Sequence, residues 1–555
     1  MLRKISFYTA LYSVLLFLAA SCGQKDVIKQ DETKIVFRYN ESAGISSLDP
    51  AYATRFEDIL AMGHLYNGLI ELDDNLNVVP SIAYGWEISD DKKEYTFFLR
   101  NDVYFHDHEA FFEGKGRRVT AHDFFFSFFR ILDPETASPG KYIFANLDKS
   151  ERSDFVGFKA LNDSVFKIFL TEPQPSFLQQ LSLMFCVVVP VDVVEKYGAD
   201  FRRNPIGTGP FRFKTWKNGV KIVLTKNEKY FEKDENNVRL PYLDGVSISF
   251  IQDRHQEYRY FVDGRFEMIS GLGPEFKDEL LTPKGDLNEE HADNVYFQKI
   301  PWLKTDYLGI LVDPTLKVVT QSPLRDKYLR QAVNYAINRQ ELVQYLRNNV
   351  GTPAEKGFVP KGMPYFEEVN FNGYNYNPEK AMQLIRGAGY KEGQTVNGIT
   401  LITTDEYKNL CEYIQHNLMD VGIDAKIEIV LANVQKQRLA QFQNNFFRKS
   451  WIADYADPTN FYQIFYSKNF APDLGSNYTH FSDMEFDKLY EKSLIAENKE
   501  ERVKIFYRME QILMDQSPVV PLFYDETARF FRKEVTGISG NAMNMLSLKR
   551  VKIRK

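Results

Sequence analysis

The chain has 555 residues, with 69 Lys and Arg residues against 75 Asp and Glu residues and a formal net charge of -6. At roughly 100 to 200 residues per domain, this length corresponds to several domains or to one large unit with several lobes. Aromatic residues make up 15% of the sequence, which excludes a disordered chain, a collagen and a coiled coil. The slightly acidic balance argues against a general nucleic-acid-binding protein, because neutralising phosphates requires a basic field.

The N-terminus is the first informative segment. Arg3 and Lys4 precede an apolar run over residues 5–20, which stops at the sequence A-A-S-C ending at Cys22. The run is shorter than the roughly 20 residues needed to span a bilayer, and its order of basic, apolar and small residues is typical of a secretory signal. A-A-S-C also resembles the bacterial lipoprotein box, in which the Cys becomes the new N-terminus and carries lipid. We therefore predict a lipoprotein signal peptide at 1–21 and lipidation of Cys22, with ordinary cleavage beside an incidental Cys as the alternative.

The chain contains three cysteines. They form neither a disulfide framework nor the C-x-x-C spacing of zinc and redox sites. We predict that Cys186 and Cys411 are buried thiols, with a disulfide between them as the alternative. The polar stretch that follows the predicted lipid attachment is expected to form a flexible tether over residues 22–33.

Strand and helix signals alternate along the rest of the chain. Residues 94–105 are rich in aromatic and branched side chains, which predicts a strand. A helix is predicted to begin at Thr120, which forms a pair like a capping box with Asp123, and to end before Pro134. These are the first strand and helix of a mixed α/β pattern.

Two further helix signals occur in the second half of the chain. Apolar residues recur at helical spacing, and Asn338 and Glu341 directly after them predict the start of a new helix. Asn377, followed by Pro378, predicts another helix, which Gly387 and Gly389 end. The apolar stripe consists of Leu329, Val333, Ala336 and Ile337. Helices alternating with strands imply an α/β architecture.

Catalytic motifs are absent from the sequence. It has no G-x-S-x-G elbow, no phosphate-binding loop, no H-E-x-x-H and no strand followed by G-x-G-x-x-G. The nearest approach to a metal motif is the run from His106 to Glu109, H-D-H-E. Alternation along a strand would direct its two His side chains to one face and its two acids to the other, so we predict a solvated strand end. We expect no enzyme activity, no metal and no cofactor.

A series of longer segments occurs in a fixed order over nearly the whole chain, and together they resemble one family. The chain is similar to the extracytoplasmic solute-binding proteins of ABC importers, in the branch that binds peptides (bacterial solute-binding protein family 5). The order and the number of the segments carry the resemblance, which agrees with the predicted export. The segments are S-L-D-P from Ser47, H-L-Y-N-G-L from His64, P-S-I-A-Y-G-W-E from Pro80, V-T-A-H-D-F-F-F-S-F from Val119, N-P-I-G-T-G-P-F from Asn204, L-R-Q-A-V-N-Y-A-I-N-R from Leu329, Y-N-P-E-K-A from Tyr376 and P-V-V-P-L-F from Pro518.

The resemblance implies an α/β fold of the type II periplasmic binding class, with two lobes, a hinge and an extra subdomain as in cluster C. It assigns lobe I to residues 27–56, 184–298 and 515–555, the extra subdomain to 57–183 and lobe II to 299–514. It further implies a monomeric receptor that captures dipeptides or oligopeptides between its lobes and presents them to an ABC permease with its ATPase subunits. The lipid would hold it in the bacterial cell envelope, facing the periplasm or the cell surface.

The run over residues 446–458, F-F-R-K-S-W-I-A-D-Y-A-D-P, looks like the ligand strand of this family. In peptide-binding members, the aspartate of W-x-A-D-Y receives the α-ammonium of the peptide, and the backbone around the Trp pairs with the peptide as an added strand. This match assigns the carboxylate role to Asp454 and strand contact to Ser450, Trp451 and Ile452. The alternative for Asp454 and Trp451 is structural, as an acid that caps a turn and a core Trp.

Arg448 and Asp457 are further candidates in the same run. Arg448 lies where some relatives carry an arginine near the carboxylate end of the peptide, with a surface arginine as the alternative. Asp457 precedes a proline, which favours a turn over ligand contact. Earlier in the chain, relatives often have an aromatic residue in contact with the ligand where this sequence has Gly140, with Tyr142 two positions later.

Other ligands remain open within the same fold. The family contains binders of nickel chelates and of oligosaccharides. The eight His residues form no tight cluster in the sequence, which argues weakly against nickel, whereas the abundant aromatic residues could stack on sugar rings. A hydrolase is a third reading, which the missing catalytic motifs disfavour.

Overall fold

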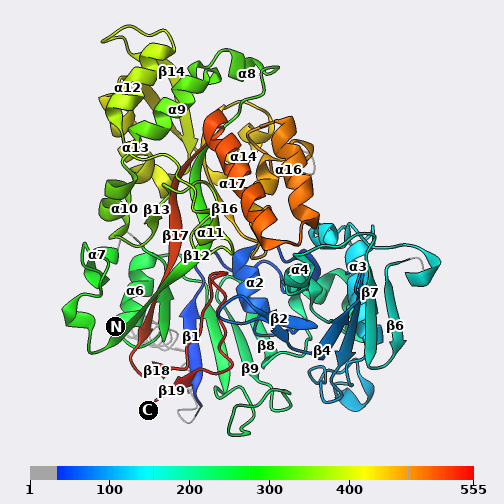
Figure 1. The fold of residues 1–555 in the computed structure, drawn as a ribbon. Helices are drawn as coiled ribbons and strands as arrows, with labels where there is room; N and C mark the ends of the chain where they lie inside the picture. Colours follow the sequence, from blue (N-terminus) through cyan, green and yellow to red (C-terminus); the bar gives the residue numbers. More distant parts are fainter. Residues whose placement is uncertain (1–33, 154–155, 274–275, 473–474, 555) are drawn as a thin grey trace, which may run out of the picture. The chain divides into compact units, whose positions relative to one another are not determined.

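An eleven-stranded mixed sheet organises the unit formed by residues Val36–Lys555 (Figure 1). The computed structural model describes residues 34–153, 156–273, 276–472 and 475–554. The predicted signal peptide, the lipidation of Cys22 and the tether lie outside these residues. Within the described ranges, no helix has the length and apolar character needed to cross a membrane.

The strands of this sheet follow one another in space in an order that differs from their order in the chain. In spatial order they are β15 (Ile423–Ile429), β14 (Val396–Thr403), β16 (Phe446–Ile452), β12 (Val295–Ile310), β17 (Val519–Arg532), β11 (Met268–Ser270), β1 (Val36–Asn40), β10 (Gly245–Ser249), β9 (Lys221–Lys226) and β8 (Phe211–Lys217), with β13 (Thr352–Pro353) beside β17.

The long strands β12 and β17 join the two halves of this sheet and run side by side in Figure 1. β16 pairs with β12 only over residues 304–310, and β11 pairs with β17 only over residues 529–531. The antiparallel register of β12 and β17 is interrupted between Pro301 and Thr305 and again between Asp306 and Tyr307. In the described part of the chain, the two halves of the sheet are therefore continuous only through this strand pair, which is irregular near its middle.

Smaller sheets accompany the large one. The helix α3 (Ala121–Leu132) packs on the four-stranded small sheet through Phe166 of that sheet. The ring centroid of Phe166 lies 6.1 Å from that of Phe124 and 5.6 Å from that of Phe128. The strand predicted over 94–105 is correct only as far as Leu99, because the chain then leaves the sheet. The small sheets are β2 (Ile70–Leu72) with β3 (Val78–Pro80), β18 (Val535–Thr536) with β19 (Lys552–Ile553), and β4 (Ala83–Ile88), β5 (Glu94–Leu99), β7 (Val165–Phe169) and β6 (Phe158–Asn162) in that order.

The helices begin where the predicted caps lie. A capping box joins Thr120 to Asp123 at the start of α3. The Asn338 side chain accepts a hydrogen bond from the Glu341 amide at 3.2 Å and caps α10 (Arg339–Arg347), which follows α9 (Lys327–Ala336). Asn377 caps α12 (Pro378–Gly387) in the same way. The predictions of these three helix starts are confirmed. Each cap binds backbone amides that lack a partner within the helix.

The remaining helices cover the sheets or connect their strands (Figure 1). They are α2 (Phe56–Met62), α4 (Phe177–Leu181), α5 (Val191–Tyr197), α6 (Arg254–Val262), α7 (Lys277–Leu280), α8 (Lys317–Thr320), α11 (Phe366–Val369), α13 (Lys408–Asp420), α14 (Ala432–Ala440), α15 (Thr459–Tyr462), α16 (Met484–Ile495) and α17 (Lys499–Gln516).

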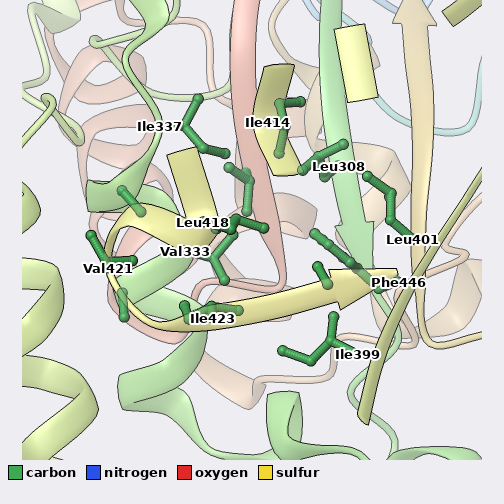
Figure 2. Packing of buried hydrophobic residues seen from close by; sticks show 14 of the residues in the cluster. Leu308, Val333, Ile337, Ile399, Leu401, Ile414, Leu418, Val421, Ile423 and Phe446 are labelled. Carbon is green, nitrogen blue, oxygen red and sulfur yellow. The ribbon is translucent and has the colours of Figure 1, made fainter. Parts of the chain in front are cut away.

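The predicted apolar stripe packs into a core between α9, α13 and strands β12, β14, β15 and β16 (Figure 2). Val333 and Ile337 are fully buried there, in the same cluster as Leu401 and Phe446. Cys411 belongs to the same core, and both Cys411 and Cys186 are buried free thiols. The prediction of two buried thiols is confirmed.

The predicted solvated strand end from His106 to Glu109 is only partly correct: Asp107 and Glu109 are exposed, whereas His106 is buried and these four residues form no strand. His106 is buried, with Nε2 3.0 Å from the carbonyl oxygen of Gly209, and burial lowers its pKa to about 4. Because a carbonyl only accepts, Nε2 carries the proton of a neutral ring. Asp107 bonds Lys229 at 2.8 Å and His108 lies 3.2 Å from the Tyr197 hydroxyl. The side chains have separate partners, and no group of metal-ligand residues occurs in the described ranges.

Candidate functional site

A cavity of about 680 Å³ is lined by segments that lie far apart in the sequence. Most of the wall comes from three segments, which lie within residues 53–74, 182–187 and 539–550. The fourth is the end of β16 and the turn after it, from Ser450 to Asp454. Tyr142 also lines the cavity. A volume of this size is typical of pockets that hold small ligands.

Four of the six predicted ligand residues line this cavity: Ser450, Trp451, Ile452 and Asp454. The other two lie elsewhere and have buried partners. Arg448 is 7% exposed and forms an ion pair with Asp306 of β12. Asp457 is 4% exposed and accepts hydrogen bonds at 2.8 and 2.7 Å from Nη2 of Arg502 on α17.

The part of β16 beside the cavity has an unpaired edge. On one side, β16 pairs with β12 from Phe446 to Ile452. On the other side, β14 pairs only with Phe446 and Phe447. Within the described residues, no backbone pairing continues on that side over residues 450–452. These residues therefore present backbone donors and acceptors at a free strand edge.

Asn460 forms hydrogen bonds with the side chains of both Trp451 and Asp454. Its Oδ1 accepts hydrogen bonds from Nε1 of Trp451 at 3.0 Å and from the backbone amide of Asp454 at 3.1 Å. Its Nδ2 donates to Oδ2 of Asp454 at 3.1 Å. Asn460 is fully buried in α15. Sequence reasoning missed this residue, although an amide directly before the aromatic residues Phe461 and Tyr462 is a signal that could have found it.

The Asp454 carboxyl group lines the cavity, and the residue is exposed there, although neighbouring protein removes part of its solvent. This partial loss of solvent raises the pKa of Asp454, and the hydrogen bond from Asn460 opposes the change. Within the described residues, Oδ1 of Asp454 accepts no hydrogen bond. A partly desolvated carboxylate with one free oxygen is a favourable partner for a cationic group.

The wall around Tyr142 differs from the arrangement that the resemblance implies. A side chain at Gly140 would meet the ring of Phe185, whose atoms lie 2.6 Å from the position of an added Cβ. Phe185 and Tyr142 both line the cavity. Burial raises the pKa of Tyr142, and the nearby Asp454 adds to this effect. Two aromatic side chains from different segments thus occupy this wall, although Gly140 itself carries none.

A second group of charges lies on the cavity wall. Nζ of Lys549 lies 2.8 Å from Oε1 of Glu71 and 2.8 Å from Oε1 of Glu232. Tyr230 also donates to Glu232, at 2.6 Å. Burial raises the pKa of Glu71, whereas Lys549 lowers it. Sequence reasoning missed this group, because Glu71 and Lys549 are 478 positions apart.

A cavity beside a free strand edge and a carboxylate suits a solute-binding receptor. Residues 77–473 match the family model of bacterial extracellular solute-binding proteins, family 5 Middle. This match covers more than half of the chain, and the chain belongs to this family.

Three known proteins illustrate the relationship. The chain is 25% identical over 546 residues to the dipeptide-binding protein DppE of Bacillus subtilis, and the aligned region covers 95% of this chain and 93% of the relative. It is 26% identical over 489 residues to the dipeptide-binding protein of Escherichia coli, covering 85% and 86% of the two chains. The solved structure of the periplasmic binding protein DppA of Helicobacter pylori in complex with peptide STSA has a TM-score of 0.76 and 25% identity, covering 95% of this chain and 100% of that one.

These matches confirm the predicted family and the α/β periplasmic binding fold with two lobes. The three relatives are binding proteins, and the family is extracellular, in agreement with the predicted export. The domain boundaries drawn from the resemblance stay predictions.

Proposed function

We propose that this protein is the lipid-anchored receptor of an ABC importer and captures dipeptides or oligopeptides in the cavity between its lobes, without catalysing a reaction. An ABC permease with its ATPase subunits would then receive the bound peptide. The dipeptide-binding relatives and the complex with peptide STSA support a peptide ligand.

The observation that carries this proposal is the free edge of β16 beside Asp454 in one cavity. A peptide that lies along residues 450–452 would extend the sheet by one strand, using backbone groups that every peptide has. Its α-ammonium would bind Oδ1 of Asp454, which has no protein partner among the described residues. Recognition of these two shared features would make binding tolerant of peptide sequence.

We assign separate roles to the predicted residues of this run. Ser450 and Ile452 would contribute backbone to the added strand, and the ring of Trp451, held by Asn460, would form part of the pocket wall. Arg448 and Asp457 would support the ligand strand from the interior, since each is already paired with a buried opposite charge.

The anchor is proposed from the sequence alone. Cys22 would carry the lipid, and residues 22–33 would give the receptor freedom to reach its permease. Cys22→Ser should then move the protein from the detergent phase to the aqueous phase in a detergent-partition experiment. Gel filtration of the lipid-free protein would test the expected monomer.

Native mass spectrometry of the purified protein tests the ligand class. We expect masses of bound peptides, released on denaturation, and calorimetric binding of short unmodified peptides to the stripped protein. Protein that carries no peptide and binds none from a mixed set of two to five residues would contradict the proposal. Mass analysis of the recovered peptides also distinguishes a receptor, which returns them intact, from a hydrolase.

A further inference from the structure

We propose that the cavity selects peptides that carry a lysine or arginine side chain, and that Glu71 and Glu232 form the subsite for this second positive charge. This inference rests on the proposed function, because it names the class of peptide that the same cavity prefers. Its basis is the charge of the wall and the geometry of one ion cluster within it.

The wall of the cavity carries an excess of negative charge. Five acidic side chains line it, against two basic ones. His64, which also lines it, is neutral because burial lowers its pKa to about 4. The acids are Glu71, Asp73, Asp74, Glu232 and Asp454, and the bases are Lys549 and Arg550. One α-ammonium at Asp454 would therefore leave a net negative wall.

Glu71 and Glu232 share a single cation. Nζ of Lys549 lies 2.8 Å from an oxygen of each carboxylate, so a single ammonium group is the ion-pair partner of both. The side chains are partly enclosed, with 37% exposure for Glu71, 20% for Glu232 and 17% for Lys549. In such surroundings, opposite charges attract more strongly than they do in bulk water. A second cation from the ligand would complete the cluster.

Asp73 keeps the field negative beside this cluster. The side chain and the backbone amide of Asn77 both donate to its carboxylate, at 3.0 and 2.8 Å, and these hydrogen bonds lower the pKa of Asp73. The group stays ionised, although its partners are neutral. The arrangement disfavours an acidic ligand side chain, because like charges in an enclosed site repel one another.

Calorimetry with three tripeptides that differ only at the central residue tests the inference. Ala-Lys-Ala should bind about tenfold more tightly than Ala-Met-Ala, which has a neutral side chain of similar length, and Ala-Glu-Ala should bind most weakly. The preference for lysine should shrink as salt is raised, because ions screen partly exposed charges. Equal affinities for the lysine and methionine peptides would overturn the inference.

Substitutions in the cluster test which residues cause the preference. The double change Glu71→Gln and Glu232→Gln removes two negative charges from the wall and leaves Lys549 without a carboxylate partner, so the preference for Ala-Lys-Ala over Ala-Met-Ala should be lost. Glu228→Gln is the matched control, since Glu228 is exposed and lies outside the cavity wall. A double variant that melts like the wild type but keeps the lysine preference would overturn the assignment to Glu71 and Glu232. Failure of all three peptides to bind the wild type would instead overturn the proposed function.

Discussion

The side-chain amide of Asn460 donates a hydrogen bond to Oδ2 of Asp454 at 3.1 Å, and this contact fixes the orientation of the carboxylate. The oxygen of the same amide is occupied by Trp451 and by the backbone of Asp454. Because Asn460 uses its polar atoms within the protein, it has no role as a direct ligand. Oδ1 of Asp454 keeps no protein partner among the described residues, so it can accept a hydrogen bond from a ligand in the cavity.

Replacing Asn460 by leucine tests this support. The change removes the partners of three polar groups, so the free energy of unfolding should fall by about 1 to 3 kcal/mol. Peptide affinity should fall as well, since Asp454 and Trp451 lose their common anchor. Denaturant unfolding and calorimetry well below the melting temperature measure the two effects separately. Asn236→Ala, at an exposed position, is the control, and unchanged affinity in Asn460→Leu would refute the positioning role.

Asp454→Asn should weaken peptide binding and stabilise the free protein at the same time. Loss of a charge-assisted hydrogen bond costs about 1.5 to 3 kcal/mol, which corresponds to a decrease in affinity of roughly 10- to 100-fold. The raised pKa of Asp454 means that its ionised form is unfavourable in the folded state, so a neutral amide should raise the melting temperature near neutral pH. Calorimetry and thermal melts check both directions.

The exposed Asp200 provides a matched control for this change. Asp200→Asn should alter neither the peptide affinity nor the melting temperature. If Asp454→Asn binds peptides as tightly as the wild type, the ammonium site has been assigned to the wrong residue.

Peptide binding should depend on pH through Asp454. Its raised pKa places protonation above the usual range of an aspartate, and only the ionised form attracts an ammonium group. Affinity should therefore be full above this pKa and fall as pH decreases through it. Near the same pH, binding should release protons, because the bound ammonium lowers the pKa again.

Calorimetry in buffers of different ionisation enthalpy measures this proton release. The Asp454→Asn variant should lack both the release and the loss of affinity at low pH. An unchanged pH profile in that variant would assign the titration to another group.

The ion pair between Asp457 and Arg502 is expected to affect stability and not peptide affinity. Both groups are buried, and Arg502→Met would leave the Asp457 charge without its partner, at a cost of about 3 to 5 kcal/mol. Combining it with Asp457→Asn should restore part of this loss, because no unpaired charge is then buried. Denaturant unfolding measures the cycle. Weaker peptide binding by a fully folded Asp457→Asn variant would return Asp457 to the ligand site.

Local sequence signals predicted the helix starts well. The caps at Thr120, Asn338 and Asn377 act on amides within the next few residues, so their pattern is complete in the sequence. His106 was misjudged because its burial depends on Gly209, which is 103 positions later. A strand pattern cannot reveal such a contact.

The candidate site shows the same division between local and distant information. The run around Asp454 was found because it is contiguous and resembles a family motif. Asn460 and the Glu71–Lys549 contact were missed, since one is a buried amide without a motif and the other joins opposite ends of the chain. The free edge of β16 also needs the fold, because it depends on where β14 stops pairing.

The interrupted register of β12 and β17 has a consequence for how binding strength could evolve. These two strands alone carry the described sheet from one half to the other, and their pairing is irregular between Pro301 and Tyr307. In the proposed receptor, closure around a peptide would bend this short segment, so the free-energy difference between the open and closed forms would include the cost of that bending. Substitutions in this segment would change the affinity for all peptides by the same factor. The cavity wall sets the preference among peptides, so that preference would stay the same.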